Sequence, residues 1–343
     1  MKKILIVFVV AIIFVMSCSR SKVNVDVDVS NVKVDLKVYR LEQDLFKMDT
    51  NKLAEQVPAL KQKYGRFLNL YSQKVIMIGS PSDAHYPVYL KSFLVDSTMN
   101  VVYKRVSEVF PDMKNFENEM TEAFRHYKYY FPDRPVPQIY TMISGFNQSL
   151  VTDDKMIGIA LDKYLGKDCD FYEKLTIEKY RRYKMHPQKM VSDCMEAWAM
   201  AEFPSNDSIG DLLGNMLYQA KVQYFVDAIL PQQPDSLKFG FTTMQLKWCE
   251  KFEADIWKYL VEQKLLFTTE NMKIKKFVDD GPFTTDFLSP TNAKAIKPPA
   301  RAAVWLGREI IRSYMDHNPK LSLKDLMLEN DYHKILNLAK YKP

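Results

Sequence analysis

The sequence predicts a mostly helical α+β domain with a small β-sheet. Three observations support this fold class: residues 23–38 alternate between apolar and polar side chains, two short apolar runs follow near the middle of the chain, and helical periodicity then continues to the C-terminus. The 343 residues include only 10 glycines, and 13% are aromatic. This composition is typical of a packed core rather than of a disordered or fibrous protein. Because no long linker rich in glycine and serine interrupts the chain, we expect a single domain over 23–343.

The N-terminus has the three parts of an export signal. Two lysines precede an unbroken apolar run from Ile4 to Phe14, and a serine directly precedes Cys18. The run is shorter than the roughly 20 residues that a helix needs to cross a bilayer. We therefore predict a lipoprotein signal peptide at 1–17 that is cut before Cys18, and a lipidated anchor and short tether at 18–22.

This anchor determines the predicted location of the mature chain. Two hydrophobic signals already give stable membrane attachment, so acylation of Cys18 would hold the protein to a membrane of the cell envelope, outside the cytoplasm. The sequence leaves open whether this is the inner or the outer membrane. The net charge is +6, and the basic residues are scattered along the chain. Neither nucleic acid nor a strongly basic lipid-binding patch is therefore predicted as a partner.

The cysteines exclude two further classes. Besides Cys18, the chain contains Cys169, Cys194 and Cys249. Three thiols can form at most one disulfide, and no pair has the CxxC spacing of a zinc or redox site. Stability must therefore come from the core.

The alternation at 23–38 predicts an extended strand, interrupted near Ser30 and Asn31, where a turn or bulge would shift the register. Regular alternation indicates a buried face, which favours pairing with the sheet of the domain over a role as a mere spacer. A helical pattern follows from Arg40 and continues to Leu70.

The middle of the chain contains the clearest helix and the two apolar runs. Apolar residues repeat at helical spacing over 112–131, and Pro132 closes this helix. The runs at 138–143 and 156–161 are rich in isoleucine and aromatic residues. They predict two strands around a loop at 145–147. Further helices are expected from the same helical spacing of apolar residues. They lie at 188–203, 209–230, 243–264, 301–316 and 323–339.

A search for catalytic chemistry finds no intact motif. Phosphate-binding glycine loops, the GxSxG elbow and HExxH are all absent from the sequence, and so is any close pair of histidines. His85 is expected in a solvated loop. Acid pairs occur at 153–154, at 168 and 170, and at 279–280, where solvated loops are the expected setting. We predict no catalytic residue, no metal site and no cofactor.

The order of strands and helices nevertheless resembles that of zinc peptidases. Helix 188–203 contains Glu196, placed like the glutamate of HExxH, but Met195 and Ala199 stand where the two histidine ligands would be. Gln219 lies 23 residues after Glu196. A zinc peptidase of this layout would be expected to have its third ligand, a glutamate, at that position. A tetrahedral zinc site would thus lack its usual ligands. Glu196 and Gln219 are therefore candidates for a degenerate site, and we expect Asp193 and Glu196 to form a solvated helix face.

Long, ordered blocks of sequence resemble the gliding motility-associated lipoprotein GldB family over nearly the whole chain. Besides Cys18, the matching blocks are Tyr129 to Pro132, Pro137 to Asn147, Ile157 to Gly166, Asp193 to Trp198, Asp227 to Pro231, Gln245 to Cys249, Trp305 to Gly307, Ser313 to Met315 and Lys340 to Pro343. One departure is Ala300, where the family pattern leads us to expect a glycine before Arg301; alanine allows a less permissive turn.

The resemblance implies an envelope lipoprotein that supports gliding motility and the protein secretion system associated with it, without an established enzymatic activity. Its partners would be proteins of that machinery. Two alternatives stay open at this point: an envelope hydrolase or peptidase-like enzyme with an unrecognised site, and a lipoprotein that binds a nutrient or other substrate. An enzyme would require a deep cleft with convergent polar groups.

Overall fold

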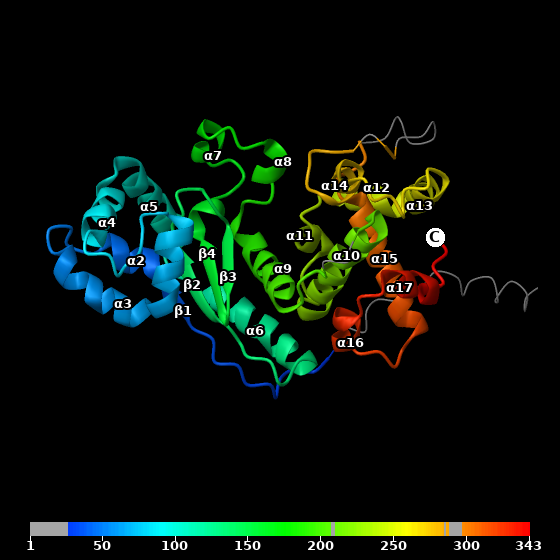
Figure 1. Cartoon of the computed structure of the whole chain (residues 1–343), viewed down its shortest axis with the longest axis horizontal. Helices are drawn as coiled ribbons and strands as arrows, with labels where there is room; N and C mark the ends of the chain where they lie inside the picture. The colour runs from blue at the N-terminus through cyan, green and yellow to red at the C-terminus, as the bar shows by residue number, and fades with distance from the viewer. Residues whose placement is uncertain (1–26, 207–209, 285, 288–296) are drawn as a thin grey trace, which may run out of the picture.

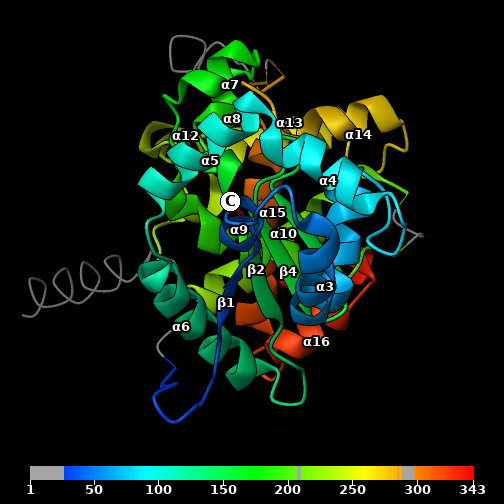
Figure 2. The same cartoon turned by 90° about the vertical axis from the view of Figure 1, so that its left-hand side faces the viewer.

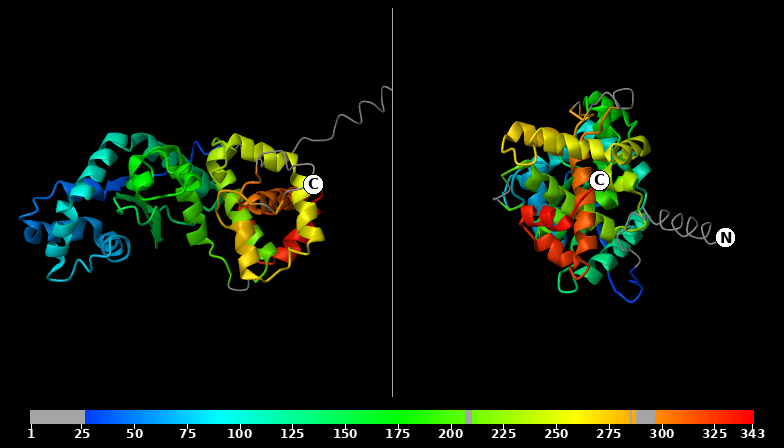
Figure 3. Two further views of the ribbon diagram at one scale, coloured as in Figure 1. Left: turned by 90° about the horizontal axis from the view of Figure 1, so that it is seen from above. Right: turned by 90° about the vertical axis from the view of Figure 1, so that its right-hand side faces the viewer.

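The computed structural model describes residues 27–206, 210–284, 286–287 and 297–343. The predictions for the signal peptide, for Cys18 and for the tether lie outside this part. Within it, the sheet and the first helices form one half of the molecule, and the later helices form the other half (Figures 1 and 3). Among the described residues, no helix is both long and apolar enough to span a membrane.

The sheet has four strands in the order β1-β2-β4-β3. Strands β1 (Val38–Arg40), β2 (Gln138–Met142) and β4 (Met156–Ala160) run parallel, while β3 (Leu150–Asp153) is antiparallel to β4 and forms one edge. Figure 2 shows β1, β2 and β4 side by side. The two predicted strands are therefore confirmed as β2 and β4. Strand β3, which lies between the two predicted strands and after the predicted loop at 145–147, was not predicted.

The N-terminal segment differs from the prediction. Residues 27–37 belong to no strand, and only 38–40 join the sheet, through β2. The predicted turn is present, because the N–H of Val32 donates to the C=O of Val29 (2.9 Å) across Ser30 and Asn31. Burial still follows the alternation, with Val29 and Leu36 buried. The alternation thus correctly predicted which side chains pack on the domain. It did not show that residues 27–37 have no neighbouring strand.

One face of the sheet is covered by α2 (Leu41–Phe46), α3 (Leu53–Leu70), a π-helical turn at Tyr71–Val75, and α4 (Tyr86–Val95). Tyr140 of β2 stacks on Phe67 of α3, with ring centroids 4.1 Å apart. Gly158 of β4 makes room for this ring, since a Cβ atom there would lie 2.6 Å from Phe67 and 2.7 Å from Val151. A glycine is therefore required at this position for close packing rather than for backbone freedom.

The opposite face packs on α6 (Lys114–Tyr130) and α9 (Met190–Glu202), with contributions from α5 (Ser97–Val109). Ile139, Ile157 and Ile159 point into this core, whereas Tyr140, Met142 and Met156 point to the other face. Such alternation is what a sheet covered on both sides requires. The sequence analysis predicted α6 and α9 but missed α4 and α5.

Of the remaining helices in the described part, six lie in predicted segments: α10 (Leu212–Ile229), α12 (Thr243–Lys251), α13 (Glu253–Glu262), α15 (Ala302–His317) and the pair α16 (Leu323–Leu328) and α17 (Tyr332–Ala339), which share one segment. Four short helices were not predicted: α7 (Asp170–Lys174), α8 (Lys179–Arg182), α11 (Asp235–Phe239) and α14 (Asn271–Val278). The segments 243–264 and 323–339, each predicted as one helix, both consist of two. The mostly helical α+β class is confirmed.

Helices α10 and α15 cross closely at Gly307, whose α-carbon faces Ala220. A Cβ at Gly307 would lie 3.0 Å from that of Ala220.

Beside the crossing, α10, α11 and α15 enclose a network of charged side chains. Asp227 lies 2.8 Å from Lys238 and 2.8 Å from Arg312. The network has three acids and three bases, namely Asp227, Asp235, Glu309, Lys238, Arg308 and Arg312. Because the charges balance, their burial between the helices is tolerated.

Candidate functional site

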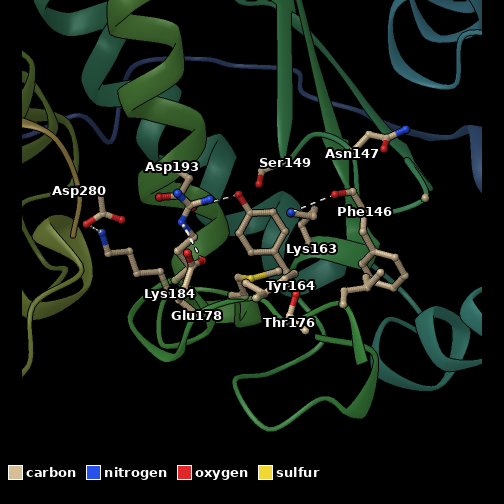
Figure 4. A pocket seen from close by; sticks show the side chains of 15 residues that line it. Phe146, Asn147, Ser149, Lys163, Tyr164, Thr176, Glu178, Lys184, Asp193 and Asp280 are labelled. Atoms are coloured by element: carbon tan, nitrogen blue, oxygen red, sulfur yellow. Dashed lines mark hydrogen bonds and ion pairs between the residues drawn. The ribbon is translucent and has the colours of Figure 1, made fainter. Parts of the chain in front are cut away.

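A polar cleft of about 640 Å³ lies at the carboxyl ends of β2 and β4 (Figure 4). In sheets with parallel strands, this end is where ligands commonly bind. The loop after β2, the segment after β4, the region of α8, helix α9 and the segment near Asp280 all contribute. The side chains that carry its polarity are Asn147, Ser149, Lys163, Tyr164, Thr176, Glu178, Arg181, Lys184, Asp193 and Asp280.

The loop after β2 is held in an unusual conformation by one buried carboxylate. Gly145 and Phe146 both have positive φ angles (66° and 64°), which is uncommon for a phenylalanine. Asp162 accepts hydrogen bonds from the N–H of Ser144 (3.0 Å) and from the N–H of Phe146 (2.6 Å). Burial raises the pKa of the Asp162 carboxyl, while these hydrogen bonds act in the opposite direction. Asp162 thereby fixes the wall of the cleft.

Lys163, next in sequence, points into the cleft. Its ammonium donates to the C=O of Phe146 (3.2 Å), and it makes no ion pair with any described residue. Burial lowers the pKa of Lys163, and the nearby charge of Asp162 partly offsets this. An ammonium has three N–H donors, so Lys163 retains donors for a further acceptor.

The carboxylates of the cleft, by contrast, already have partners. Asp193 lies 2.6 Å from Lys189 and accepts from the Tyr164 hydroxyl (3.0 Å). Asp280 lies 2.7 Å from Lys184, and Glu178 lies 3.4 Å from Arg181. Burial lowers the pKa of Lys184, an effect opposed by Asp280. Each of these carboxylates therefore already has a cation beside it.

Glu196 is placed differently from the prediction. Asp193 and Glu196 were expected to form a solvated face, but their side chains are only 25% and 20% exposed. Glu196 lies 3.6 Å from Arg301, which precedes α15. The positive φ angle is at Arg301 itself (62°) and not at Ala300. The departure from the family pattern at Ala300 therefore imposes no strain there.

Gln219, the second candidate for a degenerate site, lies half-buried on α10, which packs against α9. No hydrogen bond joins Gln219 to Glu196 in the described part. Across the same residues, no group of three or more His, Cys, Asp or Glu side chains is arranged to hold a metal ion.

The other polar residues of the sequence analysis lie mostly outside the cleft. His85 is exposed beside Asp83 (3.3 Å), directly before α4. Of the acid pairs, Asp153 contacts Arg66, Asp168 contacts Lys167 and Asp170 contacts Lys174. From these pairs, only Asp280 reaches the cleft.

The family model for gliding motility protein GldB matches residues 22–343. The chain belongs to the GldB family. No match was found among curated proteins or among solved structures. Membership in the GldB family supports an involvement in gliding motility and an envelope lipoprotein, as the resemblance implied.

Two of the blocks that resemble the GldB family meet at the cleft. Pro137 to Asn147 supplies β2 and the loop held by Asp162, and Ile157 to Gly166 supplies β4, Asp162 and Lys163. Asp162 and Lys163 were not among the site residues predicted from the sequence. An aspartate and a lysine directly after a buried strand were the available signal.

Proposed function

We propose that this chain is a lipoprotein anchored through Cys18 in the cell envelope, where it binds partner proteins of the gliding machinery and of the associated secretion system without catalysing a reaction. Residues 1–17 serve as the signal peptide, 18–22 as the lipidated tether, and 23–343 as one folded domain. Family membership supports the link to gliding.

The observation that carries the non-catalytic role is the pairing of the three carboxylates that line the cleft. Asp193, Asp280 and Glu178 each have a cationic neighbour, and Glu196 faces Arg301. A general base must be able to take a proton from a bound substrate or water. A carboxylate whose oxygens already contact a cation is less available to take that proton.

The zinc-peptidase-like helix order is retained in this proposal as a scaffold without its ligands. Met195 and Ala199 cannot bind zinc as histidines would, and Gln219 offers an amide where a carboxylate is the better ligand. The residues at these positions therefore do not fit a zinc ion.

The test is a chromosomal Cys18→Ser replacement in the source bacterium, compared with a deletion of the gene and with the unaltered strain. Without a lipid-bearing thiol the protein should be absent from membrane fractions, and spreading of colonies should be lost as in the deletion. A Ser19→Ala replacement, which keeps Cys18, serves as the matched control and should spread normally. Normal spreading by the deletion strain would contradict the proposed role in gliding.

A further inference from the structure

The edge strand β3 leaves part of its backbone without partners. Within the described ranges of the chain, β3 pairs with β4 on one side only, and no further strand follows it in the sheet. All four of its residues are partly exposed. In Figure 1, β3 lies at the edge of the sheet beside α9. An unpaired strand edge is a template on which another extended chain can add.

The hydrogen-bond pattern shows which groups face outward. The N–H of Ala160 donates to the C=O of Ser149 (2.9 Å), so Ser149 belongs to a hydrogen-bonded pair with β4. Such pairs alternate along antiparallel strands. Val151 and Asp153 therefore also face β4, whereas Leu150 and Thr152 direct their N–H and C=O groups to the outer edge. In the described part, these outward groups have no backbone partner.

The side chains of β3 do not cover this edge, which α9 approaches on one face of the sheet. Asp153 contacts Arg66 of α3 (2.7 Å), and it shares a sheet face with Val151, which packs in the core beside α3. Leu150 packs in the core on the α9 side. Successive side chains point to the two faces of a sheet in turn. The side chains of β3 therefore point above and below the sheet and do not lie along its outer edge.

The same edge leads directly into the polar cleft. Ser149 lines the cleft and immediately precedes β3, so β3 runs away from it. A strand added antiparallel to β3 would therefore have its C-terminal end at the cleft. There the lysine without an ion pair, Lys163, is available, whereas Lys184 and Arg181 already face carboxylates. Asp162 is directed to Ser144 and Phe146 rather than to the open cleft.

We propose that β3 binds an extended segment of a partner protein by strand addition, antiparallel to β3, with a carboxylate at the C-terminal end of that segment held by Lys163. The outward N–H and C=O groups of Leu150 and Thr152 supply main-chain hydrogen bonds, as in other cases of strand addition. This inference rests on the proposed function and names the class of partner surface that the protein recognises.

The test uses full-length lipoprotein in detergent and two fluorescent heptapeptides of alternating threonine and valine. One peptide ends in a free carboxylate and the other in an amide. Main-chain pairing tolerates many sequences, so a generic strand-forming peptide is a fair probe. Fluorescence anisotropy should show that the carboxylate peptide binds at least about tenfold more tightly than the amide peptide. This is the difference in affinity expected for one hydrogen bond to a charged group.

Three variants separate the two parts of the site. Thr152→Pro removes one outward N–H without removing a hydrogen bond to β4, and it should weaken both peptides. Lys163→Gln should weaken the carboxylate peptide by about tenfold and leave the amide peptide unchanged. Lys167→Gln, an exposed lysine four residues further on that contacts Asp168, is the matched control and should bind like the unaltered protein.

Equal affinity for the two peptides, unchanged binding by Lys163→Gln, or no binding at about 1 mM peptide would overturn the inference. Because the comparison of the two peptides uses the unaltered protein, it remains decisive even if Thr152→Pro fails to fold. The result is also independent of the Cys18 experiment. Absent peptide binding with lost spreading of the Cys18→Ser strain would reject strand addition alone, whereas binding with normal spreading of the deletion strain would reject the role in gliding alone.

Discussion

Glu196 of α9 lies 3.6 Å from the guanidinium of Arg301, a residue more than 100 positions later in the chain. In the sequence, Glu196 has the position of the glutamate of an HExxH motif, with Met195 and Ala199 in place of the two histidines. In this GldB family member the carboxylate instead faces a cation, and both side chains are largely buried, with exposures of 20% and 12%. The pair thus joins α9 of the sheet-bearing half to the start of α15.

This pairing predicts an asymmetric response to substitution. Arg301→Met should lower the free energy of unfolding by about 1–3 kcal/mol, because it leaves the Glu196 charge without a partner in a largely buried place. Adding Glu196→Gln to Arg301→Met should recover much of that loss. Urea unfolding of the four proteins measures this coupling. If the effects of the two substitutions simply add, the residues do not interact and the account of Glu196 is wrong.

The close packing at Gly158 makes a second prediction. Gly158→Ala should destabilise the protein by about 1–3 kcal/mol, since the new methyl group would overlap the Phe67 ring and Val151. Gly210→Ala is the matched control, because no atom of the described residues lies within 4 Å of a Cβ at that position. Thermal unfolding should therefore show a lower midpoint for Gly158→Ala and nearly no change for Gly210→Ala. Equal midpoints would mean that β4 and α3 are not packed as described.

The cleft wall depends on Asp162. Asp162→Asn replaces one accepting oxygen by a donor, so one of the N–H groups of Ser144 and Phe146 would lose its partner. We expect a loss of about 1–3 kcal/mol in the free energy of unfolding. Asp168→Asn, at an aspartate that is 83% exposed, should have almost no effect. Denaturant unfolding compares the two, and a stable Asp162→Asn protein would show that the loop does not need this carboxylate.

Much of the fold was predictable because it is encoded in local periodicity. In α6, residues such as Phe116, Met120 and Phe124 recur at helical spacing, and all of them are buried. The segment 27–37 shows the limit of this reasoning. Its alternation correctly indicated that Val29 and Leu36 face the protein, but whether an extended chain becomes a strand depends on a neighbour that the local pattern does not contain.

The cleft was less predictable for the same reason. Lys163 and Asp193 come together only because β4 and α9 lie side by side, and Glu196 meets Arg301 across more than 100 residues. Sequence spacing predicted a solvated face for Asp193 and Glu196, because charged residues three apart on a helix usually face water. Long-range partners make these side chains part of a site, and a single sequence carries no direct signal for them.

A buried lysine gives a prediction for the pH dependence of stability. Lys221 of α10 donates to the C=O groups of Met327 (3.2 Å) and Glu329 (2.5 Å). Burial lowers its pKa to about 8, although the Glu329 charge acts in the opposite direction. Between pH 8 and about 10.5, the unfolded chain therefore binds more protons at this site than the folded protein, and the contribution of Lys221 to stability rises with pH.

The measurement is the difference in free energy of unfolding between the unaltered protein and Lys221→Met, followed from pH 7.5 to 9.5. We expect this difference to shift in favour of the unaltered protein as the pH rises through about 8. Taking the difference removes the contribution of the tyrosines, which titrate in both proteins. A difference that stays constant over this range would show that Lys221 titrates normally.

The measurement that tests the central claim most directly is the gliding speed of single cells whose chromosomal gene carries Glu196→Gln, with the amount of protein checked by immunoblot. A binding role without catalysis predicts the speed of the unaltered strain, because the amide keeps the shape of the side chain next to Arg301. Loss of gliding at an unchanged amount of the protein would contradict this account and would show that the Glu196 carboxylate takes part in chemistry.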